Sequence, residues 1–185
     1  MATILTHPAV PLALGLGLGK QLIPTRLMLL GMLLSVLPDL DVAMLMLGVP
    51  WSSVYAHRGF SHSISFALLI SGLILFYWQG QNTRGNKGEP LMVFVFCFVV
   101  LLSHTFLDAL TWGGQGVALL WPFDHARFRF DYRPIPASPL SVSGFMRWGG
   151  FVLLSELKLI WLPLCAFTAS LWAARKWLVP KLLNQ

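Results

Sequence analysis

Imidazole and carboxylate side chains interrupt segments of this sequence that are otherwise strongly apolar. The residues that could act together are His7, Asp39, Asp41, His57, His62, His104 and Asp108. A charged side chain in lipid costs at least ~2.5–3.5 kcal/mol on insertion scales, so residues of this kind usually serve a function. Mixed imidazole and carboxylate ligands suit Zn²⁺, Mn²⁺ or Fe²⁺ better than Ca²⁺. We therefore predict a site for a divalent metal ion, with zinc favoured and manganese or iron as alternatives.

The spacing of two pairs agrees with a shared ion. His104 and Asp108 are four residues apart, so they project from one face of a helix. Pro38 permits a bend just before Asp39 and Asp41, so both carboxylates can point inward from a broken helix. Each pair could therefore supply two ligands to one site.

The elements that must position these residues are membrane helices. Segments at about 26–48, 91–112 and 151–172 are long enough to cross a hydrocarbon core of about 30 Å. A segment at about 62–79 is at the short end of that range, and residues 8–19 form a re-entrant stretch or a short helix. We expect an all-α polytopic membrane bundle of four to five helices, in one domain over 1–185, with an irregular cap at about 113–150.

Composition supports this fold class. Hydrophobic residues make up 56% of the chain and charged residues only 11%, which is too few to furnish a soluble surface. The formal charge of +6 comes from basic residues in short loops and near the C-terminus, an arrangement that favours anionic membrane lipids as partners over direct nucleic-acid binding. Cys97 and Cys165 lie in apolar runs, and we expect both to be buried.

An up-and-down path through the bundle brings the candidate ligands to one face of the membrane. The first apolar stretch begins after His7 and ends at Lys20 on the opposite side, and the next helix returns to residues 39–41. Residues 57–62, with an imidazole at each end of a glycine-containing turn, follow on that side. Two more helices return the chain to residues 104–108. The apolar lengths of the helices alone therefore predict this convergence.

Each residue also has a purely structural explanation. His7 could be an ordinary interfacial residue, and Asp39 could cap the helical piece that follows it. The serines beside His62 could begin the next helix, and Asp108 could pair with His104 only to neutralise buried charge. These explanations work singly but leave the convergence unexplained.

Basic residues indicate the orientation. The side opposite the site carries Lys20, Arg26, Arg84, Lys87, Arg175, Lys176 and Lys181. The site side carries Arg58, Arg127, Arg129, Arg133 and Arg147. Because positive charge favours the cytoplasmic side, seven against five places the site at the non-cytoplasmic face of the membrane.

Four strings give the chain a family resemblance. They are HRGFSHS at 57–63, LPDLD at 37–41, SHTFLD at 103–108 and LLWPF at 119–123, followed by Arg127-Phe128-Arg129. With a histidine near the N-terminus, His7, they resemble the YdjM-like family, described as LexA-binding, inner-membrane-associated metal-dependent hydrolases. That family is distantly similar to zinc-dependent phospholipase C and to zinc-dependent nucleases, which use an H-x-x-x-D ligand pair. Val42 departs from the family pattern, because many relatives have a histidine there.

Residues and resemblance together imply a metal-assisted hydrolase that acts on a phosphoester, small or lipid-like, at the membrane interface. Asp41 is a candidate ligand or the general base that orients water. Arg58 is a candidate catalytic residue and, with Arg127 or Arg129, a candidate for binding and neutralising the phosphoryl oxygens.

Two alternatives stay open at this point. An ion or proton transporter would also need intramembrane histidines and acids. A non-catalytic regulatory protein, with a LexA-type repressor as partner, follows from the resemblance alone.

Overall fold

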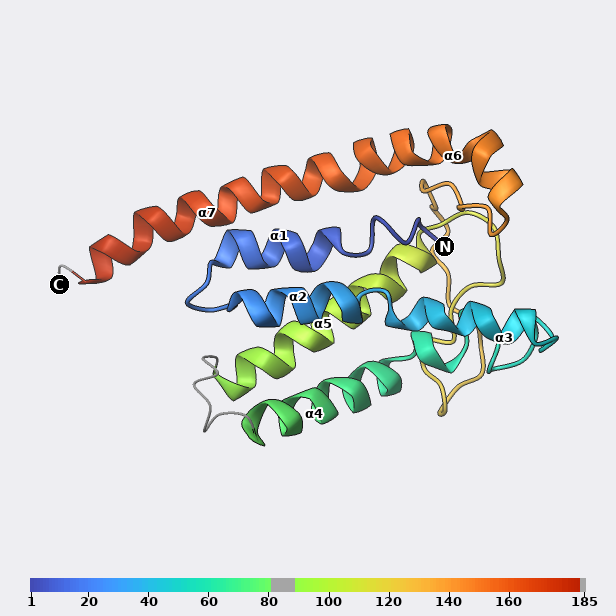
Figure 1. The fold of residues 1–185 in the computed structure, drawn as a ribbon, viewed down its shortest axis with the longest axis horizontal. Coiled ribbons are helices and arrows are strands. Elements are labelled where there is room, and N and C mark those ends of the chain that lie inside the picture. The colour runs from blue at the N-terminus through green and yellow to red at the C-terminus, as the bar shows by residue number, and fades with distance from the viewer. Residues whose placement is uncertain (81–88, 184–185) are drawn as a thin grey trace.

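The chain folds into an all-α bundle, as predicted. The structure is a computed structural model, and it describes residues 1–80 and 89–183, with side chains as far as residue 177. The helices are α1 (Ala9–Leu18), α2 (Thr25–Leu34), α3 (Val42–Met46), α4 (Ile64–Gly80), α5 (Pro90–Ala109), α6 (Val142–Glu156) and α7 (Leu162–Leu183). Short 3-10 helices η1 (Leu37–Asp41) and η2 (Phe60–His62) and a π-helical segment η4 (Leu157–Trp161) complete the helical elements of the described chain. Figure 1 shows most of the helices running along one long axis.

Three helical segments are long and apolar enough to cross a membrane: Thr25–Met46, Pro90–Ala109 and Val142–Trp177. Two shorter apolar helices, Ala9–Leu18 and Ile64–Gly80, accompany them, which agrees with the expected four to five helices. The first long segment is interrupted at η1, where Pro38 stands, as the broken-helix prediction required. The protein is therefore a multi-pass membrane bundle.

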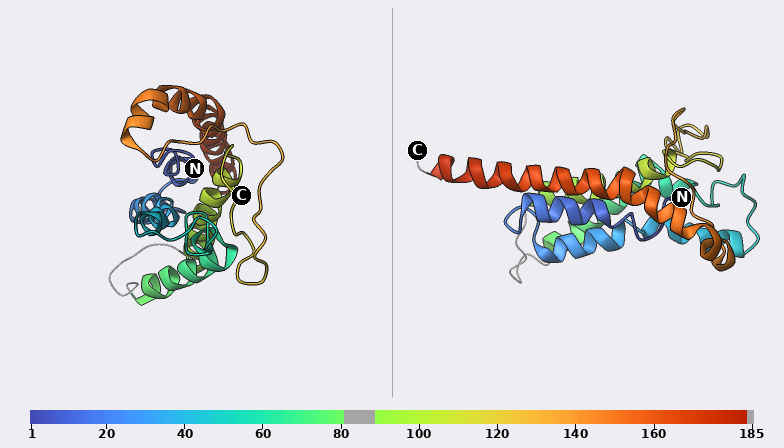
Figure 2. Two further views of the ribbon diagram at one scale, coloured as in Figure 1. Left: turned by 90° about the vertical axis from the view of Figure 1, so that its right-hand side faces the viewer. Right: turned by 90° about the horizontal axis from the view of Figure 1, so that it is seen from above.

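The last helix is longer than expected. Helical structure begins at Val142, inside the segment expected to be an irregular cap, because the Ser141 side chain caps α6 by accepting from the amide of Gly144. From there α6, η4 and α7 continue without a break. The 36 residues of Val142–Trp177 would measure about 54 Å at 1.5 Å per residue, well beyond a core of about 30 Å. In Figure 2 this helix runs past the other elements at the C-terminal end.

The apolar core lies where α2, α4 and α5 meet. Its fully buried members include Leu27, Val93 and Val100. Gly31 of α2 allows a close approach, since a Cβ there would lie 2.5 Å from Cε1 of Phe96. This packing holds the end of α2 against α5, and η1, which follows α2, places Asp39 3.5 Å from His104 of α5.

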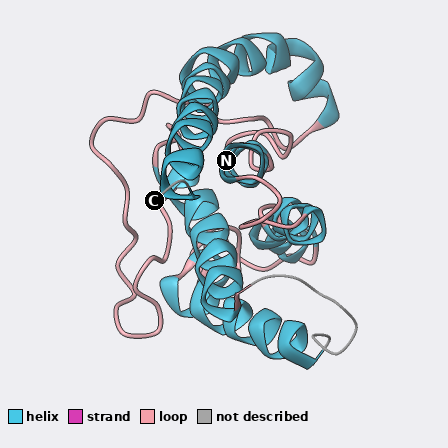
Figure 3. Cartoon of the chain, turned by 90° about the vertical axis from the view of Figure 1, so that its left-hand side faces the viewer, coloured by secondary structure: helices cyan, strands magenta, loops and turns pink. Residues whose placement is uncertain are grey.

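The long non-helical segments gather at one end of the bundle. Figure 1 shows the cap, the loop after α3 and the N-terminal segment together at this end, away from the C-terminus, and Figure 3 shows the long loops, in pink, beside the helices. Isolated β-bridges, Thr111 to Ile135 and Val117 to Phe128, tie the cap together. Arg84 and Lys87, used above to predict orientation, lie outside the described residues, as does the side chain of Lys181, so the orientation stays a prediction.

Candidate metal centre

The seven predicted ligand residues lie together at the end of the bundle that carries the cap. Different elements supply them: the segment before α1, the 3-10 helices η1 and η2, the loop before η2, and α5. Every one is at most 8% exposed: His7, Asp39, Asp41, His57, His62, His104 and Asp108. Asp39 and His104 each lie 14 residues into a span, about 21 Å from its start at 1.5 Å per residue. In a core of about 30 Å this depth places the cluster near one membrane interface.

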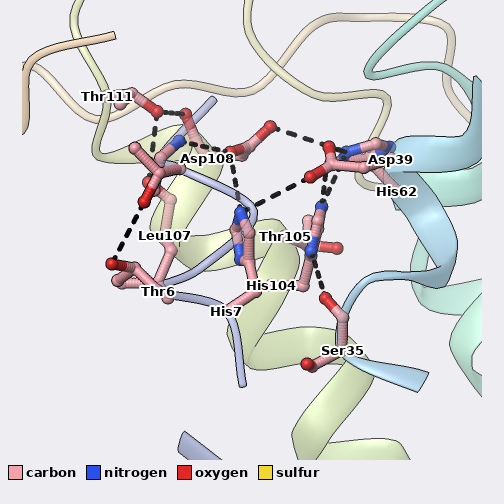
Figure 4. A network of polar contacts seen from close by, with 12 residues as sticks. Thr6, His7, Ser35, Asp39, His62, His104, Thr105, Leu107, Asp108 and Thr111 are labelled. Atoms are coloured by element: carbon pink, nitrogen blue, oxygen red, sulfur yellow. Dashed lines mark hydrogen bonds and ion pairs between the residues drawn. The ribbon is translucent and has the colours of Figure 1, made fainter. Parts of the chain in front are cut away.

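Four of these residues form the centre of the cluster. Asp39, His62, His104 and Asp108 each direct a ligand atom to one spot, with all four atoms within 4.8 Å of one another. The Nε2 atoms of His62 and His104 are 3.1 Å apart. Figure 4 shows these side chains turned toward one another. The group could hold a metal ion.

The main chain fixes the tautomer of His104. Its Nδ1 lies 2.7 Å from the carbonyl oxygen of Ser35, and a carbonyl can only accept, so Nδ1 carries the proton. In the neutral ring the lone pair is then on Nε2, which lies 3.5 Å from Oδ1 of Asp39. Metal-binding histidines are commonly oriented through the other ring nitrogen in this way.

His57 is oriented by a carboxylate. Its Nδ1 donates to Oδ1 of Asp41 at 2.7 Å, which leaves the lone pair on Nε2. The other Asp41 oxygen accepts from the Ser61 hydroxyl at 2.5 Å and from the Arg58 amide at 3.1 Å. Both oxygens of Asp41 are therefore engaged within the protein, an arrangement that suits the positioning of a histidine ligand.

Several buried polar atoms in the cluster have no hydrogen-bond partner. They are both ring nitrogens of His7, both carboxylate oxygens of Asp39, and Nε2 of His57. Burying such groups without a partner is costly, and a carboxylate above all requires a cation or a donor. Since Asp39 makes no side-chain cap, the capping explanation does not account for it. The donor set therefore fits a divalent cation.

His7 completes the inner wall of the cluster. Its Nε2 lies 3.7 Å from Asp39 and 3.8 Å from Asp108, and its ring stacks on His104 with centroids 3.8 Å apart. Burial lowers the pKa of His7 to about 3, so the ring is neutral. A neutral imidazole is the form that binds a metal.

His62 behaves differently from His7 because carboxylates surround it. Burial alone would lower its pKa, but contacts with Asp108 and Asp41 raise the pKa to about 9. Without another cation, the cluster therefore keeps a proton on this ring. Ser63, next to it, caps α4 by accepting from the amide of Phe66, so the start of that helix does not need the imidazole.

Arg58 joins the cluster to a cavity. Its backbone has φ of 68°, an uncommon value for a residue other than glycine. The guanidinium donates from Nε to Asp108 at 3.0 Å and from Nη2 to the Thr111 hydroxyl at 3.0 Å. Arg127 donates to the carbonyl oxygen of Arg58 at 2.6 Å and so supports this strained turn.

The cavity beside the cluster has a volume of about 150 Å³. His57, Arg58 and Arg127 line it, together with Trp51 and the glycine-rich segment 113–116. Arg129, the third arginine predicted to contact a substrate, is exposed and does not line this cavity. The structure thus brings two of the three arginines to one opening.

One buried carboxylate, that of Glu156, is not among the predicted site residues. Glu156 is fully buried, and it accepts from the amide and hydroxyl of Thr3, both at 2.5 Å, and from the hydroxyl of Thr6 at 2.7 Å. This contact anchors the segment that carries His7 to the start of η4. The signal was available, because a single glutamate in an apolar helix is costly unless it is paired.

Two weaker predictions, both on cysteines, can be placed. Cys97 is buried as expected, but Cys165 is exposed, and that prediction was wrong. An apolar run does not say which face of a helix finds a protein neighbour, and Cys165 lies on a face of α7 that the bundle leaves open.

The apolar spans and the buried polar cluster define a multi-pass α-helical membrane protein with a candidate metal centre. The sequence matches the family described as "YdjM inner membrane protein" over residues 1–178, and the chain belongs to that family. Inner membrane protein YbcI of Escherichia coli (strain K12) is 40% identical over 177 residues, which cover 95% of this chain and 100% of the relative. No solved structure matches the chain. The predicted resemblance and the multi-pass inner-membrane location are thereby confirmed.

Proposed function

We propose that this protein is a membrane-bound metal-dependent hydrolase that acts on a phosphoester at the membrane interface. The observation that carries the proposal is the buried group of Asp39, His62, His104 and Asp108, whose ligand atoms lie within 4.8 Å of one another. His7 adjoins this group, because its Nε2 lies 3.7 Å from Asp39 and 3.8 Å from Asp108 and has no hydrogen-bond partner. A divalent ion held there would lower the pKa of water towards ~7 and polarise a phosphoryl oxygen. Zinc suits this donor set best, with manganese or iron as alternatives.

The protein's own groups divide into ligands and supports. Ser35 holds His104 through its carbonyl oxygen, and Asp41 holds His57 through a carboxylate oxygen. We assign Asp41 to positioning rather than to direct coordination, because both of its oxygens already accept hydrogen bonds. Preorganised ligands of this kind lower the cost of assembling a site.

Arg58 and Arg127 supply positive charge where a phosphate would enter. Both line the 150 Å³ cavity on which His57 opens. Asp108 and Thr111 hold the Arg58 guanidinium, so it keeps its direction without the substrate. Nη1 also donates to the carbonyl oxygen of Gly113 at 3.2 Å, so one N–H on Nη1 and one on Nη2 are left to donate to phosphoryl oxygens.

A second cavity supports a lipid as the phosphoester. It measures about 300 Å³, is lined by Trp112, Pro139, Trp148 and Phe151, and shares Ala137 with the polar cavity. An apolar space beside a cationic one suits a molecule with a phosphate at one end and a hydrocarbon chain at the other. The depth of the cluster near one interface agrees with such a substrate.

Metal analysis of the purified protein in detergent, with a screen of lipid phosphoesters, tests the proposal. His104→Ala should lose bound metal and all hydrolysis, whereas His125→Ala, an exposed histidine of the cap, should keep both. Full metal content in His104→Ala would show that His104 is not a ligand. Metal binding without turnover of any phosphoester would leave a metal site but refute the hydrolase. Ion transport in liposomes under those conditions would favour a transporter, and capture of a LexA-type repressor would favour a regulatory protein.

A further inference from the structure

A groove between α1 and α7 takes no part in the proposed hydrolysis. It has a volume of about 740 Å³, within the range of about 300–1,000 Å³ that small-molecule sites occupy. Small and apolar side chains line most of it, among them Ala9, Ala13, Gly15, Cys165 and Ala169. Because both helices lie in the apolar part of the bundle, the groove faces the hydrocarbon of the membrane.

One end of the groove is cationic. Lys20 and Arg175 line it there, and within the described chain neither has a carboxylate oxygen within 4.0 Å. Arg175 is half-buried, and its guanidinium occupies the space beside Gly19, where an added Cβ would lie 1.3 Å from Nη1. Gly19 has φ of 81°, so the turn that makes this room depends on glycine. Two unpaired cations therefore close an apolar groove.

We propose that this groove binds an anionic phospholipid, with an acyl chain between α1 and α7 and the headgroup phosphate at Lys20 and Arg175. The length of the groove agrees with the hydrocarbon thickness of a single leaflet. From Ala9 to Gly19 the groove spans about 15 Å at 1.5 Å per residue, which is half of a hydrocarbon core of about 30 Å. The leaflet concerned is the one opposite the candidate metal centre, since His7 precedes α1 and Lys20 follows it.

The charges favour a lipid over a second copy of the chain. Small residues also allow membrane helices to pack closely, so a dimer is the rival occupant. A second copy related by a two-fold axis along the membrane normal would, however, bring its own Lys20 and Arg175 to the same depth. Like charges would then face one another in a medium of low dielectric constant, which is unfavourable. A phosphate supplies the opposite charge.

Native mass spectrometry of the full chain in detergent, titrated with phosphatidylglycerol or phosphatidylcholine, tests this site. Each cation near a membrane surface is worth about fivefold in lipid affinity, so Lys20→Gln with Arg175→Gln should weaken phosphatidylglycerol binding about 30-fold. Arg26→Gln, the same charge change at the start of α2 and outside the groove, should change it less than about threefold. Ala169→Trp, at an exposed lining position, should fill the groove and prevent binding.

The outcomes separate the possibilities. Equal affinity for the two lipids, or equal effects of the double variant and Arg26→Gln, would overturn the proposal. A lipid-free dimer that Ala169→Trp splits into monomers would show that a second copy occupies the groove. The measurement reads retained lipid and not turnover, so it stands or falls independently of the proposed hydrolase.

Discussion

Replacing Asp41 with asparagine separates the two roles that a carboxylate at this position could have. In the structure one oxygen of Asp41 accepts from His57, and the other accepts from Ser61 and from the Arg58 amide. Asparagine keeps one acceptor oxygen and replaces the other with an amide group that only donates. If the amide faces His57, the ring must move its proton to Nε2 and loses its lone pair for a metal. If the amide group faces the backbone N–H of Arg58, two N–H donors face each other and neither has an acceptor.

Either arrangement weakens the support of His57 without removing a ligand. Loss of a group that orients a metal ligand typically lowers metal affinity by about 10–100-fold, which corresponds to about 1.4–2.7 kcal/mol. We therefore expect Asp41→Asn to bind zinc about 10–100-fold more weakly than the unmodified chain. Competition with a chromophoric chelator measures this affinity in detergent.

Asp131→Asn, an exposed aspartate of the cap, is the matched control and should bind zinc normally. Size-exclusion chromatography of both variants checks that the bundle is intact. Zinc affinity of Asp41→Asn within about threefold of the unmodified chain would refute the positioning role, because the expected loss is at least tenfold. A loss as complete as that of His104→Ala would instead make Asp41 a direct ligand.

The remaining predictions concern metal, the N-terminal anchor and the apolar cavity. Zinc at 100 times its dissociation constant should stabilise the folded chain by about 2.7 kcal/mol, seen as a higher melting temperature that a chelator reverses and that His104→Ala does not show. Glu156→Ala should lower the free energy of unfolding by about 2–5 kcal/mol, because it leaves the buried donors of Thr3 and Thr6 unpaired. Replacing the exposed Glu89 with alanine should change the free energy of unfolding by less than about 0.5 kcal/mol. Thermal unfolding in detergent distinguishes the two variants. Trp148→Ala should slow hydrolysis of long-chain phosphoesters and leave hydrolysis of short-chain phosphoesters unchanged, because Trp148 lines the apolar cavity. Hydrolysis rates measured for a series of chain lengths test this, and an equal fall for long and short chains would contradict it.

The membrane fold could be predicted from the sequence because lipid permits few solutions. A backbone without water must satisfy its own hydrogen bonds, so a long apolar run becomes a helix whatever its neighbours are. The break at Pro38 was equally predictable, since proline lacks an amide donor and crowds the preceding turn. Helices that alternate in direction then leave few choices for where residues 39–41 and 104–108 meet.

The remaining features depend on contacts between distant parts of the chain. Glu156 accepts from Thr3, 153 residues away, and no local pattern indicates that partner. The exposure of Cys165 depends on how α7 is rotated against α1, which its apolar composition does not specify. The hydrogen bonds of Asp41 likewise arise from the turn at Arg58, whose backbone conformation is unusual for a residue with a side chain.

The carbonyl oxygen that holds His104 comes from the interruption after α2. In a continuous helix the amide of Asp39 would donate to the carbonyl of Ser35, but here that amide donates to Val36 instead. Because the acceptor belongs to the main chain, small residues at position 35 can replace one another without disturbing the imidazole. A substitution survey would thus find this position tolerant, although the geometry there governs which nitrogen of the ring is basic.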